Sequence, residues 1–285
     1  MNSVNNDQTE HWKKNIILFL SSQTISLFGS ALVQYAMMWH ITLHTESGMM
    51  MTLFIICGFI PTFIFSAHEK ASDQQSTSYL EDFKLGVTYI KSNPFLKQFF
   101  LFFGIFFILM APAAFLTPLQ VTRSFGDDVW RLTAVEIAWS IGMMVGGGII
   151  AAWGGFPNKI HTMTFASLLM GICTFALGVV PVFWVYLFFM AIFGISMPIF
   201  NTPTTVLLQE KVDESYLGRI FGVFGMISTS MMPIGMLIFG PMADVIKVEW
   251  LLVGTGILIF ILSIFLGMNK VLLDTGKPVV EEPAK

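Results

Sequence analysis

Long apolar stretches, almost free of charged residues, alternate with shorter polar segments along the whole chain. An α-helix crosses the ~30 Å hydrocarbon layer of a bilayer in roughly 20 apolar residues. Stretches of about this length or longer run over residues 15–41, 49–66, 98–121, 132–154, 160–179, 182–208, 220–243 and 250–268. The pattern predicts an all-α polytopic membrane protein with eight transmembrane helices.

The stretch 160–209 contains no Asp, Glu, Lys or Arg. Because a helix rises 1.5 Å per residue, this stretch is far too long for one crossing and must contain two. Proline ends one helix and suits the start of the next. We therefore expect the turn between these two helices at Val179, Val180 and Pro181.

The longest polar interruption covers residues 67–97 and begins with a charged linker. Ser78 and Glu81 then have the spacing of a capping box, which marks the start of a helix. Apolar residues recur after them at helical spacing, at Leu80, Phe83, Val87 and Ile90. The sequence predicts a short amphipathic helix on the cytoplasmic membrane surface that ends before Asn93.

Lys and Arg residues gather on one side of the predicted spans. With the N-terminus in the cytoplasm, twelve of these residues fall inside, and Arg123, Arg131 and Lys247 fall outside. Cytoplasmic loops carry an excess of Lys and Arg. This asymmetry requires an even number of spans, so we expect both termini in the cytoplasm.

Composition supports a membrane protein and excludes several functions. Hydrophobic residues make up 55% of the chain and charged residues 12%, about half of the charged share of a soluble domain. The net charge of −3 supplies no basic face for nucleic acid. Cys57 and Cys173 lie in apolar runs without the spacing of a metal or redox site. The chain has no enzyme motif, and we expect no catalytic residue, cofactor or metal.

Polar residues inside the first span share one helix face, because Gln23, Ser26, Ser30 and Gln34 follow spacings of three and four. This face should lie against protein or water rather than lipid. Two interpretations stay open. The side chains form hydrogen bonds between helices, or they line the path of a solute.

The third and sixth predicted spans each contain two prolines. Proline frees a backbone carbonyl, which is tolerated in hydrocarbon only against protein or a water-filled cavity. The residues concerned are Pro112 and Pro118 with Thr117 and Gln120, and Pro198 and Pro203 with Asn201, Thr202, Thr204 and Thr205. Interrupted helices with polar neighbours indicate a transport site, although kinking alone would also account for the prolines.

Small residues at four-residue spacing predict close helix packing in two further spans. They are Ala138, Gly142 and Gly146 in the fourth span, and Gly222, Gly225 and Gly235 in the seventh.

Glu136 is the carboxylate that falls inside a predicted span, and such residues are candidates for function. Thr133 precedes it by three residues, which matches a capping box. Arg131 lies near enough in sequence to pair with it. Glu136 is therefore either a structural cap or a site of proton coupling.

The chain resembles the major facilitator superfamily, in particular the drug-efflux branch with macrolide-efflux proteins and the enterobactin exporter. The resemblance is carried by residues 29–48 with 54–66, by the linker EDFKLGVTYIKSNPFLKQFF at 81–100, by GGGIIAAWGGFPNKIHTM at 146–163, and by 218–244. That family has twelve helices in two halves. Here the linker follows two spans instead of six, so the resemblance implies that family helices three to six are missing.

The resemblance implies three regions. They are a two-helix N-terminal remnant at 1–66, a cytoplasmic linker at 67–97, and a six-helix transporter half at 98–285. It also makes the first, third and sixth spans the family's first, seventh and tenth helices, which line its central cavity. The implied substrate pathway contains Gln23, Ser30, Gln34, Thr117, Gln120, Asn201 and Thr204.

The function implied is proton-coupled export of small amphipathic compounds from the cell, such as macrolide-like drugs or siderophores, across the membrane that holds the protein. Glu136 would couple protons. Arg219 would act with Asp213 and Glu214 as a cytoplasmic gate, unless these are plain solvated charges. The alternative is an internally deleted remnant that does not transport, or one that needs a second copy or a partner chain.

Overall fold

The computed structural model describes residues 2–69 and 79–277, and these residues form helices without a strand. In chain order the helices are α1 (Asn2–Thr45), α2 (Gly48–Glu69), α3 (Tyr79–Ser92), α4 (Pro94–Phe115), α5 (Thr117–Phe125), α6 (Val129–Trp153), α7 (Lys159–Val179), α8 (Phe183–Lys211), α9 (Glu214–Val245), α10 (Val248–Met268) and α11 (Lys270–Thr275). The prediction of an all-α protein is confirmed for this part of the chain.

Within the described residues, six apolar helical segments are long enough to cross a membrane, and they match the last six predicted spans. They are Pro94–Phe125, Val129–Trp153, Lys159–Val179, Phe183–Lys211, Glu214–Val245 and Val248–Met268. The first of them combines α4 and α5, which are separated at Leu116 between Pro112 and Pro118. The first two predicted spans fall in α1 and α2, and their crossing of the membrane stays a prediction, as does the side on which the termini lie.

The predicted boundaries between several helices are confirmed. α7 ends at Val179 and α8 begins at Phe183, so the turn lies where Pro181 was expected to place it. The amphipathic helix α3 ends at Ser92, and Asn93 then caps α4 by accepting a hydrogen bond from the Phe95 amide at 3.0 Å. The start of the predicted capping box, Ser78, lies outside the described residues.

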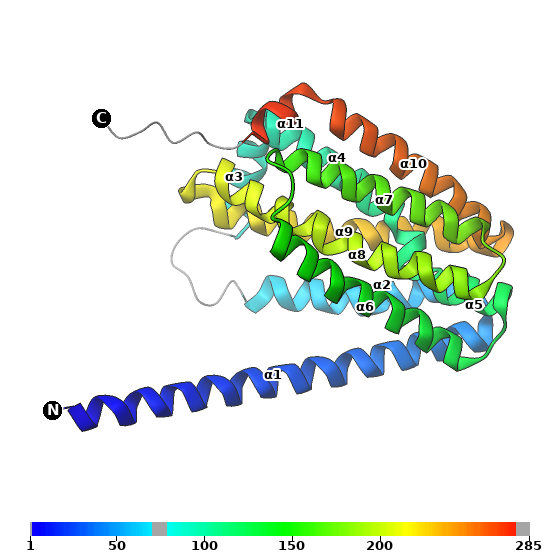
Figure 1. The fold of residues 1–285 in the computed structure, drawn as a ribbon, viewed down its shortest axis with the longest axis horizontal. Coiled ribbons are helices and arrows are strands. Elements are labelled where there is room, and N and C mark those ends of the chain that lie inside the picture. Colours follow the sequence, from blue (N-terminus) through cyan, green and yellow to red (C-terminus); the bar gives the residue numbers. More distant parts are fainter. Residues whose placement is uncertain (1, 70–78, 278–285) are drawn as a thin grey trace.

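The helices from α4 to α10 form a bundle in which α7 packs along α10, α6 along α8, and α4 and α2 along α9 (Figure 1). Glycine allows the closest approaches. A Cβ on Gly142 or Gly146 would lie 2.2 Å from a carbonyl oxygen of α8, and one on Gly235 would lie 2.7 Å from the Ile108 oxygen. Close packing is thus confirmed at these three glycines. The prediction of close packing is wrong for Gly222 and Gly225, beside which the described structure leaves open space.

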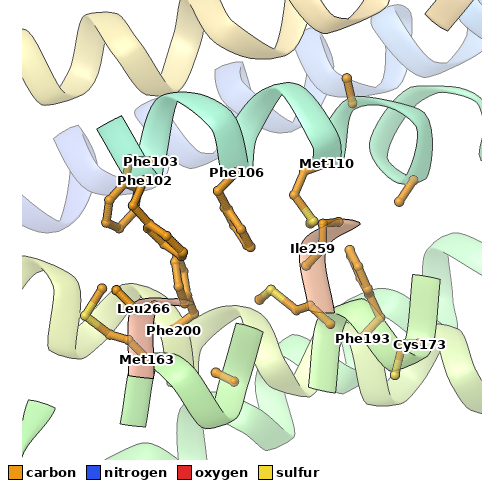
Figure 2. Packing of buried hydrophobic residues seen from close by; sticks show 14 of the residues in the cluster. Phe102, Phe103, Phe106, Met110, Met163, Cys173, Phe193, Phe200, Ile259 and Leu266 are labelled. Atoms are coloured by element: carbon orange, nitrogen blue, oxygen red, sulfur yellow. The ribbon is translucent and has the colours of Figure 1, made fainter. Parts of the chain in front are cut away.

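Phenylalanine rings fill the space between α4, α8 and α9. Figure 2 shows Phe102, Phe103 and Phe106 extending from α4 toward Phe200 of α8. The ring of Phe106 stacks on that of Phe200 with centroids 4.7 Å apart, and the ring of Phe103 lies 5.1 Å from that of Phe224 on α9. Because lipid tails are as apolar as these rings, such contacts stabilise the bundle by close packing rather than by removal of water.

α1 runs along the edge of the bundle, and its N-terminal end lies apart from the other helices (Figure 1). Its main contacts are with α2 and α5. Among the α1 side chains that the structure describes, Met38 and Thr42 are buried, and both belong to its last two turns. The helix is therefore attached to the bundle at its C-terminal end.

Candidate functional site

The polar face of α1 is exposed. The side chains of Gln23, Ser26, Ser30 and Gln34 all lie on the exposed surface, along the part of α1 that precedes its buried last turns. Each Gln carries an amide that both donates and accepts hydrogen bonds. In a membrane-length helix these groups require a polar neighbour, which a solute, water or another helix can supply.

The break between α4 and α5 holds a buried hydrogen-bond network. The Gln120 amide nitrogen donates to the Leu177 carbonyl at 2.6 Å, and the Tyr186 hydroxyl donates to the Gln120 side-chain oxygen at 2.9 Å. The Thr117 hydroxyl donates to the Ala113 carbonyl at 2.6 Å. Gln120 is 2% exposed. In this conformation Gln120 therefore joins α5 to α7 and α8, whereas Thr117 bonds back to α4 across the break, and both side chains lie away from the bundle surface.

The two prolines of α8 leave it one continuous helix from Phe183 to Lys211. Near them, the buried Thr204 hydroxyl donates to the Phe200 carbonyl at 2.7 Å, four residues earlier. Asn201 lies on the exposed surface instead. The structure thus divides the predicted pathway residues into two groups. Thr117, Gln120 and Thr204 are internal, whereas Asn201 and the polar face of α1 are exposed.

The interpretation of Glu136 as a helix cap is wrong. Its helix, α6, begins at Val129, so Glu136 lies about two turns inside rather than in the first turn. The Thr133 hydroxyl donates to the Val129 carbonyl at 3.1 Å, and Arg131 pairs with Asp128 at 3.3 Å. The two side chains that were expected to hold Glu136 therefore interact elsewhere.

Glu136 instead faces α1. The Tyr35 hydroxyl and the Glu136 carboxylate lie close enough to form a side-chain hydrogen bond. Glu136 is half-buried, while Tyr35 stays partly exposed next to Gln34. The sequence did not predict this contact, because the two residues lie on different helices. The feature of the sequence that could have indicated a polar partner for Glu136 is the position of Tyr35 beside the polar face of α1.

Arg219 lies near the start of α9, at the opposite end of the bundle from Glu136, where α3 docks. Its guanidinium lies 5.5 Å from the centre of the Tyr216 ring, which stacks on Tyr89 of α3 with centroids 4.3 Å apart. The Tyr89 hydroxyl donates to the Asp213 carboxylate at 2.9 Å. Desolvation and this hydrogen bond raise the pKa of Tyr89. The predicted gate residues Arg219 and Asp213 thus hold α3 against the bundle.

Comparison with known proteins identifies the family to which the chain belongs. The model of the Major Facilitator Superfamily matches residues 15–236, well over half of the chain. Macrolide efflux protein A of Streptococcus pyogenes is 28% identical over 189 residues, which cover 66% of this chain and 47% of that protein. The protein of the same name from Enterococcus faecalis is 28% identical over 161 residues, 56% of this chain and 50% of its own length.

A third relative is the multidrug efflux pump Tap of Mycobacterium tuberculosis, 26% identical over 120 residues, which cover 39% of this chain and 27% of the pump. No solved structure matches the chain. The chain spans about half the length of the macrolide efflux proteins that it matches. With six apolar helical segments of membrane-spanning length in the part of the chain that the structure describes, and a family match that extends from α1 into α9, it is a multi-pass membrane protein that belongs to the Major Facilitator Superfamily.

Proposed function

We propose that the chain exports small amphipathic compounds, with macrolide-like drugs or siderophores as the substrate class, in exchange for protons. The observation that carries the proposal is the exposed polar face of α1, with Gln23, Ser30 and Gln34 on a helix that is attached to the bundle at one end. A solute that carries both polar and apolar groups suits a route between this face and the apolar bundle.

The substrate route in this proposal runs beside α1 and past Asn201, the predicted pathway residue of α8 that is exposed. Thr117, Gln120 and Thr204 support it from inside, because their hydrogen bonds stabilise the break between α4 and α5 and the proline-containing part of α8. Proton coupling is assigned to Glu136, whose described partner is the Tyr35 hydroxyl of α1, on the other side of the route. The matched relatives are named for macrolide and multidrug efflux.

Accumulation of a labelled macrolide in cells tests this function. Cells that express the chain should hold less macrolide than cells with an empty vector, and the variant Gln34→Ala with Asn201→Ala should remove most of the difference. Ser263→Ala is the matched control, because this hydroxyl is buried in α10 and donates to the Ile259 carbonyl. Equal accumulation in all four strains would reject the proposal.

The second candidate is a chain that transports only together with another chain, or not at all. It is favoured by the length, since the chain covers 47% and 50% of the two macrolide efflux proteins. Major facilitator transport needs one bundle to rock against another. A second copy or a partner that supplies the missing helices would appear as a larger particle when the mass of the solubilised protein is measured.

A further inference from the structure

Asp244 joins the end of α9 to the beginning of α2. Its carboxylate accepts hydrogen bonds from the Gly48 amide at 2.7 Å, the Met49 amide at 3.0 Å and the Ser47 hydroxyl at 2.9 Å. The first amides of a helix have no partner within the helix and carry partial positive charge. The carboxylate of α9 therefore caps α2 from a position 195 or more residues later in the chain.

Arg123, in the last turn of α5, extends the same contact to a third element. Its guanidinium donates to the Ala243 carbonyl at 2.7 Å and to the Glu46 carbonyl in the turn between α1 and α2. One of its nitrogens lies 3.6 Å from the Asp244 carboxylate. We call Ser47, Gly48, Met49, Arg123 and Asp244 the Asp244 clasp. It links α5 and α9 to the N-terminal helix pair at one end of the bundle, the clasp end.

Below the clasp the backbones of α2 and α9 touch. A Cβ on Gly48 would lie 2.3 Å from the Gly240 carbonyl oxygen, so glycine is required for this approach. One turn further along α2, the Thr52 hydroxyl donates to the Met236 carbonyl at 3.0 Å, and Thr52 is 1% exposed. The contact between α2 and α9 is therefore closed at the clasp end, whereas the other end of α1 lies apart from the bundle (Figure 1).

Two sets of contacts hold α2 against α9, the Asp244 clasp and the buried layer around Thr52, and they differ in how readily they can break. The Thr52 layer is buried, but the side chains of Arg123 and Asp244 are 31% and 29% exposed. Partly exposed hydrogen bonds and ion pairs can be exchanged for bonds to water at small net cost. The clasp is thus the part of the contact between α2 and α9 that can break first. Its bonds determine how often the buried Thr52 layer becomes exposed.

We propose that the Asp244 clasp is a conformational lock that keeps the clasp end closed and must break before that end can open. The proposal goes beyond the proposed export function and does not depend on its substrate. Charge distribution predicts the clasp end to face the outside of the cell, which would make the lock an outer gate. Its closure can be measured without transport and without knowledge of that orientation.

The test measures how fast a cysteine beneath the clasp reacts with N-ethylmaleimide. Thr52→Cys is introduced into full-length protein in nanodiscs, where both ends are accessible, and Cys57 is replaced by Ser because it is exposed. Asp244→Ala removes three directed hydrogen bonds and the partner of Arg123. Because these contacts are all lost together, the modification rate should rise by at least about tenfold.

Asp128→Ala is the control, since Asp128 is also a carboxylate paired with an arginine, but it is exposed and its partner lies in the same segment of the chain. It should leave the rate at Thr52→Cys unchanged. If Asp244→Ala does not fold, Arg123→Gln provides the same test with an expected increase of several-fold. The same modification rate in the parent protein and in either folded clasp variant would overturn the proposal.

Discussion

Glu136 and Tyr35 meet across the boundary between α1 and the bundle, so the protonation of one carboxylate can change the contact between them. Glu136→Gln keeps the shape of the side chain and removes its ionisation. If Glu136 couples protons, this variant should lose efflux driven by a proton gradient by about tenfold or more, while its melting temperature changes little. Efflux that persists at the parent rate in Glu136→Gln would exclude coupling through this residue.

Tyr35→Phe tests the contribution of the tyrosine hydroxyl to this contact, because it keeps the aromatic ring and removes only the hydroxyl. We expect it to shift the pH dependence of efflux and to leave the maximum rate within severalfold of the parent. A pH profile identical to that of the parent would show that Tyr35 acts only through its ring.

Two neighbouring glycines of α6 give opposite predictions for stability. A Cβ on Gly146 would lie 2.2 Å from the Ile195 carbonyl oxygen, whereas Gly147 has open space beside it. Gly146→Ala should lower the unfolding free energy by about 1–3 kcal/mol, because the backbones of α6 and α8 must separate. Gly147→Ala should raise it by about 0.5–1 kcal/mol, because glycine is the more flexible residue in the unfolded chain. Denaturant titration in detergent distinguishes these signs, and equal shifts would contradict the packing of α6 on α8.

At the scale of elements, α3 is a docked helix whose attachment depends on Tyr89. Tyr89→Phe removes its hydrogen bond to Asp213, so amide exchange over residues 83–92 should become several-fold faster. Thr88→Ala is the control, because that hydroxyl donates only to Lys84 within α3. Unchanged exchange in Tyr89→Phe would show that ring stacking on Tyr216 is sufficient to hold the helix.

The raised pKa of Tyr89 sets the pH range of this docking. A hydroxyl whose pKa is raised by folding stabilises the docked state fully below the unfolded value of about 10, and that contribution is lost as the pH rises through the folded value. Exchange protection of α3 should therefore be constant from pH 6 to 9, after correction for the intrinsic rate, and should fall only at higher pH.

The elements were largely predictable from the sequence, and the contacts between them were not. Hydropathy locates six spans because each is long and apolar throughout, and Pro112 with Pro118 indicates the break at Leu116. The burial of Gln120 beside Tyr186 could not be predicted, because a polar residue near a kink suits a cavity wall and a buried network equally well. The Asp244 clasp depends on residues almost two hundred positions apart, which no local pattern connects.

For the whole molecule, the distribution of Lys and Arg predicts which residues face each side of the membrane. In intact cells an impermeant thiol reagent should label His44→Cys, at the clasp end, and should not label Thr88→Cys or Lys277→Cys. Each variant carries Cys57→Ser, so that the native exposed thiol does not react. Labelling of all three, or the reverse pattern, would contradict eight spans with both termini inside.

The chain matches the family but spans about half the length of the macrolide efflux proteins. The decisive property to measure on the whole molecule is therefore transport by this chain alone. Purified protein should be reconstituted into proteoliposomes, and uptake of a labelled macrolide should be followed with and without an imposed pH gradient. We expect gradient-dependent uptake that stops when the gradient is collapsed and that Gln34→Ala with Asn201→Ala reduces strongly. Uptake equal to that of protein-free liposomes under every gradient would show that this chain does not transport macrolides alone.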